Sequence, residues 1–264
     1  NETVTAEDVA EHCHVSKYYF SRLFRQETGE SIYAFIKKKK MEFSAFMLKS
    51  GKNKSITDIA GEYGYSSSNY STAFKEYFYQ SPAAFRCERF GKYHALFDAA
   101  DEHVQKIYTE MDSLIRIKEM QPYSILYERH IGNYSEMKKQ WHDFCLKYDA
   151  YQTDQTIYFE RTFDDPSITD QNQCLFDICM SDEGIKDRTK LREPAVFGTI
   201  NGGKFAVCSF KGYLSEIFLF HRKLIDIWLP LSGYVIDSRY SYDLYHTVQE
   251  DTYYMEFDVC LPIQ

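Results

Sequence analysis

The chain has 264 residues, enough for two domains with full cores, and its 44% hydrophobic and 17% aromatic content excludes a disordered protein. The net charge of −8 divides unevenly, because residues 1–92 carry a net +3 and residues 93–264 carry a net −11. The two halves are therefore expected to have different partners. No apolar run is long and uncharged enough to span a membrane, so we expect no membrane partner.

The seven cysteines are scattered without a Cys-x-x-Cys pair, a pattern that favours reduced thiols in a cytoplasmic protein over a disulfide framework. His12, Cys13 and His14 form a dense group of metal-binding residue types. However, adjacent residues on a helix point in different directions, and no second group has ligand spacing. We therefore expect no metal site and no cofactor. The first residues carry no secretion signal and read as the middle of a domain, so we expect upstream residues to be missing.

Residues 5–29 are predicted to form a helix, a tight turn and a second helix. Thr5 followed by Asp8 is a helix start signal, and Ser16 is a candidate N-cap for the second helix. Gly29 stands where a helix is expected to stop. This pattern predicts a helix-turn-helix unit.

The same pattern returns 50 positions later, with Ser55 and Asp58 as the start signal and Gly64 at the turn. The intervening residues 31–51 read as one long helix. Four lysines, Lys37 to Lys40, wrap around it. They form either a solvated helix face or a set of contacts to DNA phosphates, for which Lys37 and Lys38 are the candidates.

The run "I-x-x-I-A-x-x-x-G-Y…F-K-x-x-F-x-x-S-P-x-x-F-R", from Ile56 to Arg86, resembles the signature of AraC/XylS-type transcription activators. The resemblance covers roughly residues 1–90. It implies a bacterial protein whose two recognition helices enter successive major grooves of double-stranded promoter DNA, with RNA polymerase as a further candidate partner. It places the base-reading residues at Lys17, Tyr18, Ser21 and Arg22 in the first unit, and near Ser67, Ser68, Asn69 and Thr72 in the second.

The chemistry of the two recognition helices differs. Arg22 can make two hydrogen bonds to a guanine edge, and Asn69 can read adenine. The Ser- and Thr-rich second helix is expected to act more through phosphates, and Ser66 to Ser68 can also be read as an N-cap and turn alone. Two features depart from the family pattern. The second unit looks one residue short between its turn and Phe74, and Tyr79 stands where glycine is usual.

The second half repeats itself. "FDVC" at Phe257–Cys260 follows "FDIC" at Phe176–Cys179, and Gly132 aligns with Gly212 at a spacing of 80. Each copy reads as strand, helix and further strands. The repeat predicts a duplicated α+β domain with pseudo-twofold symmetry, with helices on one face of a shared sheet and a groove between the copies as the natural pocket.

The segments "ERHIGNYSEM", "INGGKFAVCSFKG", "WLPLSGY" and "YDLY" resemble the GyrI-like, SOUL-related effector-binding domain over roughly residues 113–264. The resemblance implies an aromatic-lined, multidrug-type cavity for bulky cationic or aromatic small molecules. In many such domains a glutamate lies in the strand after "SGY", in an aromatic-Glu-x-Tyr context, and here that position is Asp243, one methylene shorter. The candidate effector contacts are Asp243 first, then Tyr245, Tyr127, Tyr134, Trp141 and Trp228.

Each of these candidates has an alternative interpretation. The aromatic residues can be ordinary core residues, and Asp243 can belong to a surface salt bridge. Tyr245 lies two positions from Asp243 and so shares its face of the strand. Tyr127 and Glu128 face opposite sides of their strand, so at most one of them is expected to line the pocket.

The predicted architecture is a multidomain α and α+β chain. A double helix-turn-helix domain at residues 1–90 is followed by a linker and helix at 91–112 and by the effector-binding domain at 113–264. The predicted function is an effector-responsive, sequence-specific DNA-binding transcription regulator in the bacterial cytoplasm. One alternative is a DNA-binding scaffold whose second domain is vestigial or binds a protein. The other is a small-molecule hydrolase using Asp243 and Tyr245, but no catalytic motif supports it, so we expect no enzyme.

Overall fold

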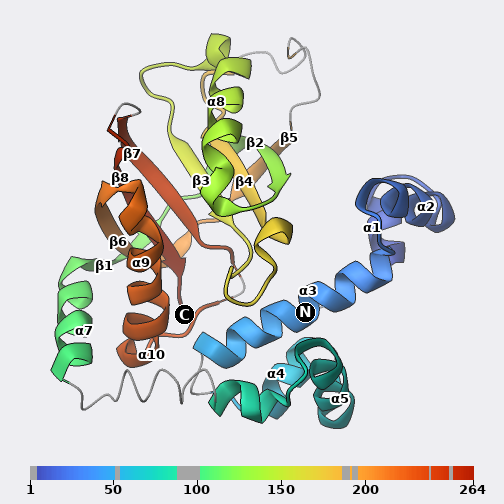
Figure 1. The fold of residues 1–264 in the computed structure, drawn as a ribbon. Helices are drawn as coiled ribbons and strands as arrows, with labels where there is room; N and C mark the ends of the chain where they lie inside the picture. The colour runs from blue at the N-terminus through green and yellow to red at the C-terminus, as the bar shows by residue number, and fades with distance from the viewer. Residues whose placement is uncertain are drawn as a thin grey trace. The chain divides into compact units, whose positions relative to one another are not determined.

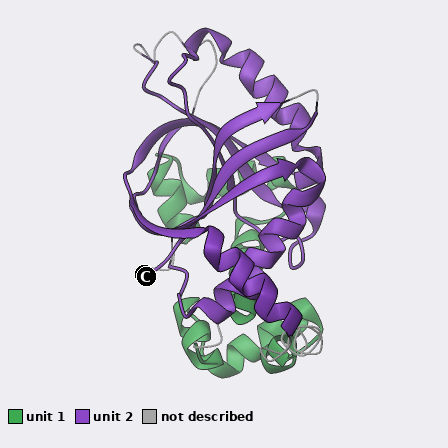
Figure 2. Ribbon diagram, turned by 90° about the vertical axis from the view of Figure 1, so that its left-hand side faces the viewer, with its two compact units in different colours: residues 1–96 green, residues 97–264 purple. Residues whose placement is uncertain are grey.

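The computed structural model describes residues 5–50, 54–87, 102–185, 191, 196–237, 239–249 and 252–264. The chain divides into two compact units, residues 1–96 and 97–264 (Figure 2). The described part of the first unit is helical, and the second combines helices with one antiparallel sheet. The predicted fold class is therefore confirmed. Residues 91–101 of the predicted linker lie outside the described residues, and a helix occupies residues 102–114.

In the described part of the first unit, a helical segment at residues 82–87 follows two helix pairs that are connected by one long helix, and Figure 1 draws the pairs and the long helix in blue to teal. Their bounds are α1 Ala6–His12, α2 Lys17–Thr28, α3 Ile32–Ser50, α4 Ile56–Glu62 and α5 Ser67–Phe78. Both predicted start signals are present as capping boxes. The side chain of Thr5 accepts from the backbone of Asp8 while the carboxylate of Asp8 accepts from the backbone of Thr5, and Ser55 and Asp58 repeat the arrangement.

The two helix-turn-helix units match in backbone conformation as well as in caps. Ser16 and Ser66 are the N-caps of α2 and α5, which have 12 residues each. Left-handed residues also recur at the same spacing: Gly29 has φ 78° and Tyr79 has φ 58°. The second helix-turn-helix unit thus lacks no residue relative to the first, and each position of α5 corresponds to the position of α2 that lies 50 residues earlier.

The second unit is a duplicated domain on an eight-stranded sheet in the order β1-β6-β8-β7-β3-β4-β2-β5. The strands are β1 Ile115–Met120, β2 Tyr123–Ile131, β3 Tyr158–Thr162, β4 Leu175–Ser181, β5 Val196–Ile200, β6 Gly203–Tyr213, β7 Tyr242–Gln249 and β8 Tyr254–Pro262. The helices are α7 Glu102–Leu114, α8 Met137–Lys147, α9 Leu214–Arg222 and α10 Leu229–Ser232, with a π-helical segment, η5, at Lys223–Trp228. Short 3-10 turns are η1 Tyr134–Glu136, η2 Asp149–Tyr151 and η3 Gln171–Gln173.

The strand order shows the predicted pseudo-twofold symmetry. One copy contributes β2, β4 and β3, the other contributes β6, β8 and β7, and the copies meet where β3 pairs with β7. The FDIC segment lies in β4 and the FDVC segment in β8, so the repeated motif is the middle strand of each copy. Register against these strands makes Glu160 equivalent to Asp243, because Glu160 pairs with Ile178 and Asp243 pairs with Val259.

Each copy places one helix over its own half of the sheet. In one half, Phe144 of α8 packs with Phe176 and Ile178 of β4. In the other, α9 and η5 pack over β6 and β8, around Trp228 and Phe257. Another cluster, which includes Phe159, Phe205 and Tyr242, takes alternate residues of the same strands and so covers the opposite face. Residues on the helix side of β3 and β7 therefore lie between α8 and α9.

Tyr79 gives a direct test of the backbone match between the helix-turn-helix units. A left-handed non-glycine residue is strained, and the Tyr79 side chain is 91% exposed, so it gains little from packing. We expect Tyr79→Gly to stabilise the first unit by about 0.5–1 kcal/mol. Hydrogen exchange of the α5 amides measures this. Gly29→Ala at the equivalent position should shift the exchange of α2 in the opposite direction, and equal effects of both changes would contradict the assignment.

Candidate functional site

The predicted base-reading residues lie in the first two turns of α2 and α5. Lys17, Tyr18 and Arg22 are exposed on α2, and Ser21 is half-buried. The Arg22 guanidinium lies 5.5 Å from the centre of the Tyr19 ring, and Lys17 pairs with Glu7 at 3.1 Å in an exposed contact. Exposed ion pairs of this kind are weak, so both cations can exchange these partners for phosphates or bases.

The equivalent surface of α5 carries hydroxyl groups instead of cations. Ser67, Ser68, Asn69 and Thr72 are all exposed. The Thr72 hydroxyl donates to the Ser68 carbonyl at 3.1 Å, as side chains of this type do on helices. Because N-caps match at a spacing of 50, the equivalent of Ser21 is Ser71, which was not predicted, while Asn69 is equivalent to Tyr19.

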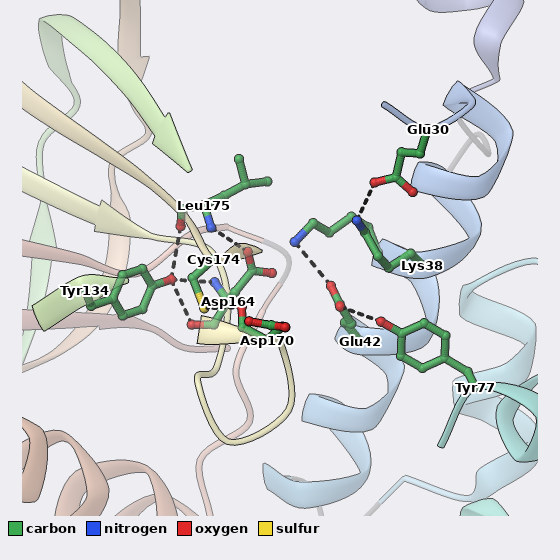
Figure 3. A network of polar contacts seen from close by, with 10 residues as sticks. Glu30, Lys38, Glu42, Tyr77, Tyr134, Asp164, Asp170, Cys174 and Leu175 are labelled. Atoms are coloured by element: carbon green, nitrogen blue, oxygen red, sulfur yellow. Dashed lines mark hydrogen bonds and ion pairs between the residues drawn. The ribbon is translucent and has the colours of Figure 1, made fainter. Parts of the chain in front are cut away.

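The lysine run of α3 is engaged within the first unit. Lys37 pairs with Glu76 at 3.5 Å, and Lys38 pairs with Glu30 (Figure 3). Lys39 pairs with Glu42, whose carboxylate also accepts a hydrogen bond from the Tyr77 hydroxyl. The Lys38 side chain is only 20% exposed. Lys37 thus connects α3 to α5, and Lys38 connects α3 to the residues that precede it, which favours a structural role over a contact to phosphates.

A group of polar and aromatic side chains gathers in the second unit, where the two copies meet. Glu160 of β3 and Asp243 of β7 stand directly opposite each other on paired strands, and both are 7% exposed. The Trp141 Nε1–H donates to the Glu160 carboxylate at 3.1 Å, and the Tyr245 hydroxyl donates to the same oxygen at 3.2 Å. His221 Nε2 lies 3.3 Å from Asp243 Oδ2. We call these five residues the carboxylate site.

Aromatic rings surround the two carboxylates. The Trp141 ring lies 5.4 Å from that of Tyr245, which in turn lies 5.2 Å from that of Phe257. His221 is stacked against Phe257 at 6.2 Å. The electron-rich faces of such rings attract cations, as the carboxylates do. The site thus combines two acidic groups with several rings on one face of the sheet.

Burial and the two facing charges shift the protonation of the site. Burial, followed by the charge of Asp243, raises the pKa of Glu160 to about 7. Burial alone would lower the pKa of His221, but the charge and hydrogen bond of Asp243, with the charge of Glu160, outweigh it and raise that pKa. Burial also raises the pKa of Tyr245 well above its ordinary value, so its hydroxyl keeps the proton that it donates.

Three of the six residues predicted to contact an effector belong to the carboxylate site, and three lie elsewhere. Tyr127 is on the other face of the sheet, where the Arg161 guanidinium lies 4.9 Å from its ring centre. Trp228 is 1% exposed in the core under α9, and its Nε1–H donates to Asp112 at 2.9 Å. These contacts correspond to the core-packing alternative for both residues.

Tyr134 also has a structural position. Its hydroxyl lies 3.0 Å from the backbone carbonyls of Asp164 and Leu175, and it accepts from the Asp164 N–H at 3.2 Å (Figure 3). The Leu175 N–H in turn donates to the Asp164 carboxylate at 2.8 Å. Tyr134 therefore connects the loop before β4 to the start of α8, and its hydroxyl group is engaged in hydrogen bonds to the backbone.

Two members of the carboxylate site, Glu160 and His221, were not predicted from the sequence. A signal for His221 was present, because it follows Gly212 by nine residues as Trp141 follows Gly132. Extending the repeat to this position would have aligned the two. Glu160 is harder to find, since its equivalence with Asp243 requires the strand register.

Two further expectations concern metals and membranes. Within the described residues, no group of three or more His, Cys, Asp or Glu side chains is placed to hold a metal ion. In the same part of the chain, no helix has the length and apolar character needed to cross a membrane.

Comparisons with known proteins match each unit to a separate family. Residues 114–264 match the model of the "GyrI-like small molecule binding domain", and residues 9–88 match that of a "Helix-turn-helix domain". The "Msm operon regulatory protein" of Streptococcus mutans is 38% identical over 82 residues, which is 31% of this chain and 29% of that protein. The "Right origin-binding protein" of Escherichia coli K12 is 29% identical over 150 residues, or 54% of this chain and 52% of that protein.

Among solved structures, the cryo-EM structure of an EcmrR–DNA complex aligns over 99% of both chains, at 10% identity and a TM-score of 0.49. Fold and comparisons together define a helix-turn-helix domain followed by a small-molecule-binding domain. The chain belongs to the GyrI-like family, and its first unit matches a helix-turn-helix domain, in agreement with the two resemblances. It matches 29% of the length of the Streptococcus mutans relative and 52% of the length of the Escherichia coli relative.

The protonation of the carboxylate site predicts how stability varies with pH. Glu160 has a folded-state pKa raised from 4.5 to about 7, so the stability that it contributes is complete below pH 4.5 and is lost as pH rises through about 7. The raised pKa of His221 acts in the same direction. We expect the unfolding free energy of the second unit to fall across this interval, by at most about 3 kcal/mol from Glu160.

Both tryptophans lie in the second unit, so their fluorescence follows its unfolding in the full chain. Glu160→Gln should reduce the decrease in the unfolding free energy between pH 5 and 8. His246→Gln, which removes the exposed pair with Asp258 outside the site, should leave it unchanged. A pH profile of Glu160→Gln identical to that of the natural protein would contradict the assigned protonation.

Proposed function

We propose that the protein is a DNA-binding transcription regulator whose second unit binds a small cationic or aromatic effector. The observation that carries this proposal is the carboxylate site, in which two buried acidic groups face each other among aromatic rings. The name of the Streptococcus mutans relative supports a regulatory role, and that of the Escherichia coli relative refers to binding at an origin. A role at promoter DNA also implies a location in the bacterial cytoplasm, and RNA polymerase is a partner within the same proposal.

The DNA-binding part of the proposal rests on the exposed surface of α2. Arg22 offers the two parallel donors that match a guanine edge, and Lys17 and Arg25 add positive charge on the same helix. The hydroxyl-rich surface of α5 offers neutral donors and acceptors, which suit phosphate oxygens and water-mediated contacts. We therefore assign base reading mainly to α2 and positioning mainly to α5.

The effector-binding part rests on charge. Two carboxylates on adjacent strands repel each other in a buried place, and burial of unpaired charge is costly. A protein that needed these residues only for packing would be more stable with neutral ones. Their presence therefore favours a ligand whose positive charge relieves the repulsion, and it argues against a vestigial domain.

One feature supports the hydrolase alternative: the Glu160 carboxyl group, with a pKa of about 7, can act as a general base. However, the only hydrogen bonds found to the Glu160 carboxylate in the described residues come from Trp141 and Tyr245, which fix its position, and no nucleophile or second catalytic group stands beside it in a known catalytic motif. The name of the Streptococcus mutans relative, a regulatory protein, points the same way. We propose that the protein is not an enzyme.

Arg22→Ala tests the DNA-binding part. Loss of two hydrogen bonds to a base should weaken binding by about 1–3 kcal/mol and relax the preference for that base. The measurement is the affinity of the full chain for DNA selected from a random library by the natural protein, at two salt concentrations. Lys38→Ala is the matched control, because Lys38 is paired with Glu30 and partly buried. An unchanged affinity for Arg22→Ala would show that α2 does not read bases.

A panel of cationic aromatic compounds tests the effector-binding part. We expect at least one compound to raise the melting temperature of the second unit in a saturable way, followed by tryptophan fluorescence. The double change Glu160→Gln and Asp243→Asn should remove this stabilisation, because neutral amides offer no counter-charge. Stabilisation that survives in the double variant would place the binding site elsewhere.

A further inference from the structure

The two carboxylates of the site have different partners. Asp243 faces the imidazole of His221 at 3.3 Å, whereas Glu160 accepts from two neutral donors, the indole of Trp141 and the hydroxyl of Tyr245. Among the described residues, no lysine or arginine pairs with either carboxylate. One acidic group therefore has beside it a side chain that can carry a positive charge, and the other does not.

This difference is built on equivalent positions of the repeat. Trp141 and His221 both stand nine residues after the glycine that ends the first strand of their copy. Each ring directs a nitrogen to the carboxylate of its own copy, Trp141 to Glu160 and His221 to Asp243. The same geometry thus carries a permanently neutral donor in one copy and a group that can be charged in the other.

His221 is also the more accessible member of its pair. Its side chain is 32% exposed, against 10% for that of Asp243. A cation arriving from solvent towards Asp243 meets a ring that already supplies a positive charge. An approach to Glu160 meets Trp141 and Tyr245, whose faces attract cations.

We propose that His221 is a resident cation that occupies Asp243 and so directs the positive group of an effector to Glu160. The proposal rests on the proposed function, because it concerns the same site. It reverses the sequence-based ranking, in which Asp243 was the first effector contact. It also assigns His221 as a specificity-determining residue that limits how much positive charge the site accepts.

The groups that face His221 agree with this role. From β7 this is Asp243, and from β3 it is Glu160, while on its own helix the neighbouring Arg222 is paired with Asp226. The acidic groups together raise the pKa of His221, which favours the imidazolium near neutral pH. Glu160, with a pKa of about 7, must lose a proton to pair with a cation. Cation affinity should therefore rise as pH rises through neutrality.

The experiment measures binding of benzyltrimethylammonium to the full chain by isothermal calorimetry between pH 6 and 8. The neutral isostere neopentylbenzene reports binding that needs no charge. We expect Glu160→Gln to weaken cation binding about tenfold or more, and Asp243→Asn to change it by less than about threefold. His221→Gln should tighten cation binding by about tenfold, since Asp243 then becomes a second unpaired anion. Binding of the isostere should be unaffected.

A measurement without ligand tests the resident cation itself. The imidazole resonances of His221, assigned by comparison with His221→Gln, should titrate above the ordinary value of 6.5 and move down in Asp243→Asn. His246, whose ring pairs with Asp258 at 3.1 Å, is the matched control, and neither change at the site should alter it.

The outcomes separate this inference from the proposed function. Cation binding that is lost in Asp243→Asn, retained in Glu160→Gln and weakened in His221→Gln would overturn the inference while leaving a cationic effector site in place. Binding by His221→Gln but not by the natural protein would support the inference strongly. No binding by any form, together with a His221 titration unaffected by Asp243→Asn, would overturn both.

Discussion

The pairing of β3 with β7 is the contact on which the second unit depends. It joins the two copies into one sheet, and it does so over three residue pairs only, one of which sets Glu160 against Asp243. The symmetry that builds the sheet therefore also creates a repulsion at its centre. Trp141, His221 and Tyr245 lessen that repulsion with hydrogen bonds and one positive charge. The candidate site is thus a consequence of how the two copies are joined into one sheet.

Local signals in the sequence were sufficient for most of the fold. The pairs Thr5–Asp8 and Ser55–Asp58 predicted helix starts because a capping box acts within one turn, and the FDIC and FDVC segments predicted equivalent strands because side-chain alternation is local. Glu160 was missed because its importance comes from a neighbour on a strand 83 positions away. Trp141 and Trp228 could not be distinguished for a similar reason. Both are aromatic residues on helical segments, and only their packing shows that Trp141 is half-buried at the carboxylate site while Trp228 is buried in the core.

The first unit shows how one backbone can carry two chemistries. Caps, helix lengths and left-handed stops agree between its two halves, yet α2 presents cations and α5 presents hydroxyl groups. The cores differ as well, because α2 has no buried residue whereas Tyr70, Ala73 and Phe74 of α5 are buried. Stability and charge are thus concentrated in different halves, which fits a division between a well-anchored positioning element and a more adaptable reading element.

Because the pairing of β3 with β7 is short, it affects how firmly the two halves of the sheet are held together. A joint of three residue pairs that contains two like charges is held less firmly than the long pairings on either side of it, such as the nine pairs between β6 and β8. Neutralising one charge would tighten the joint without moving any strand. The charge at this joint therefore sets how independently the two halves of the sheet can move, with strand order and register unchanged.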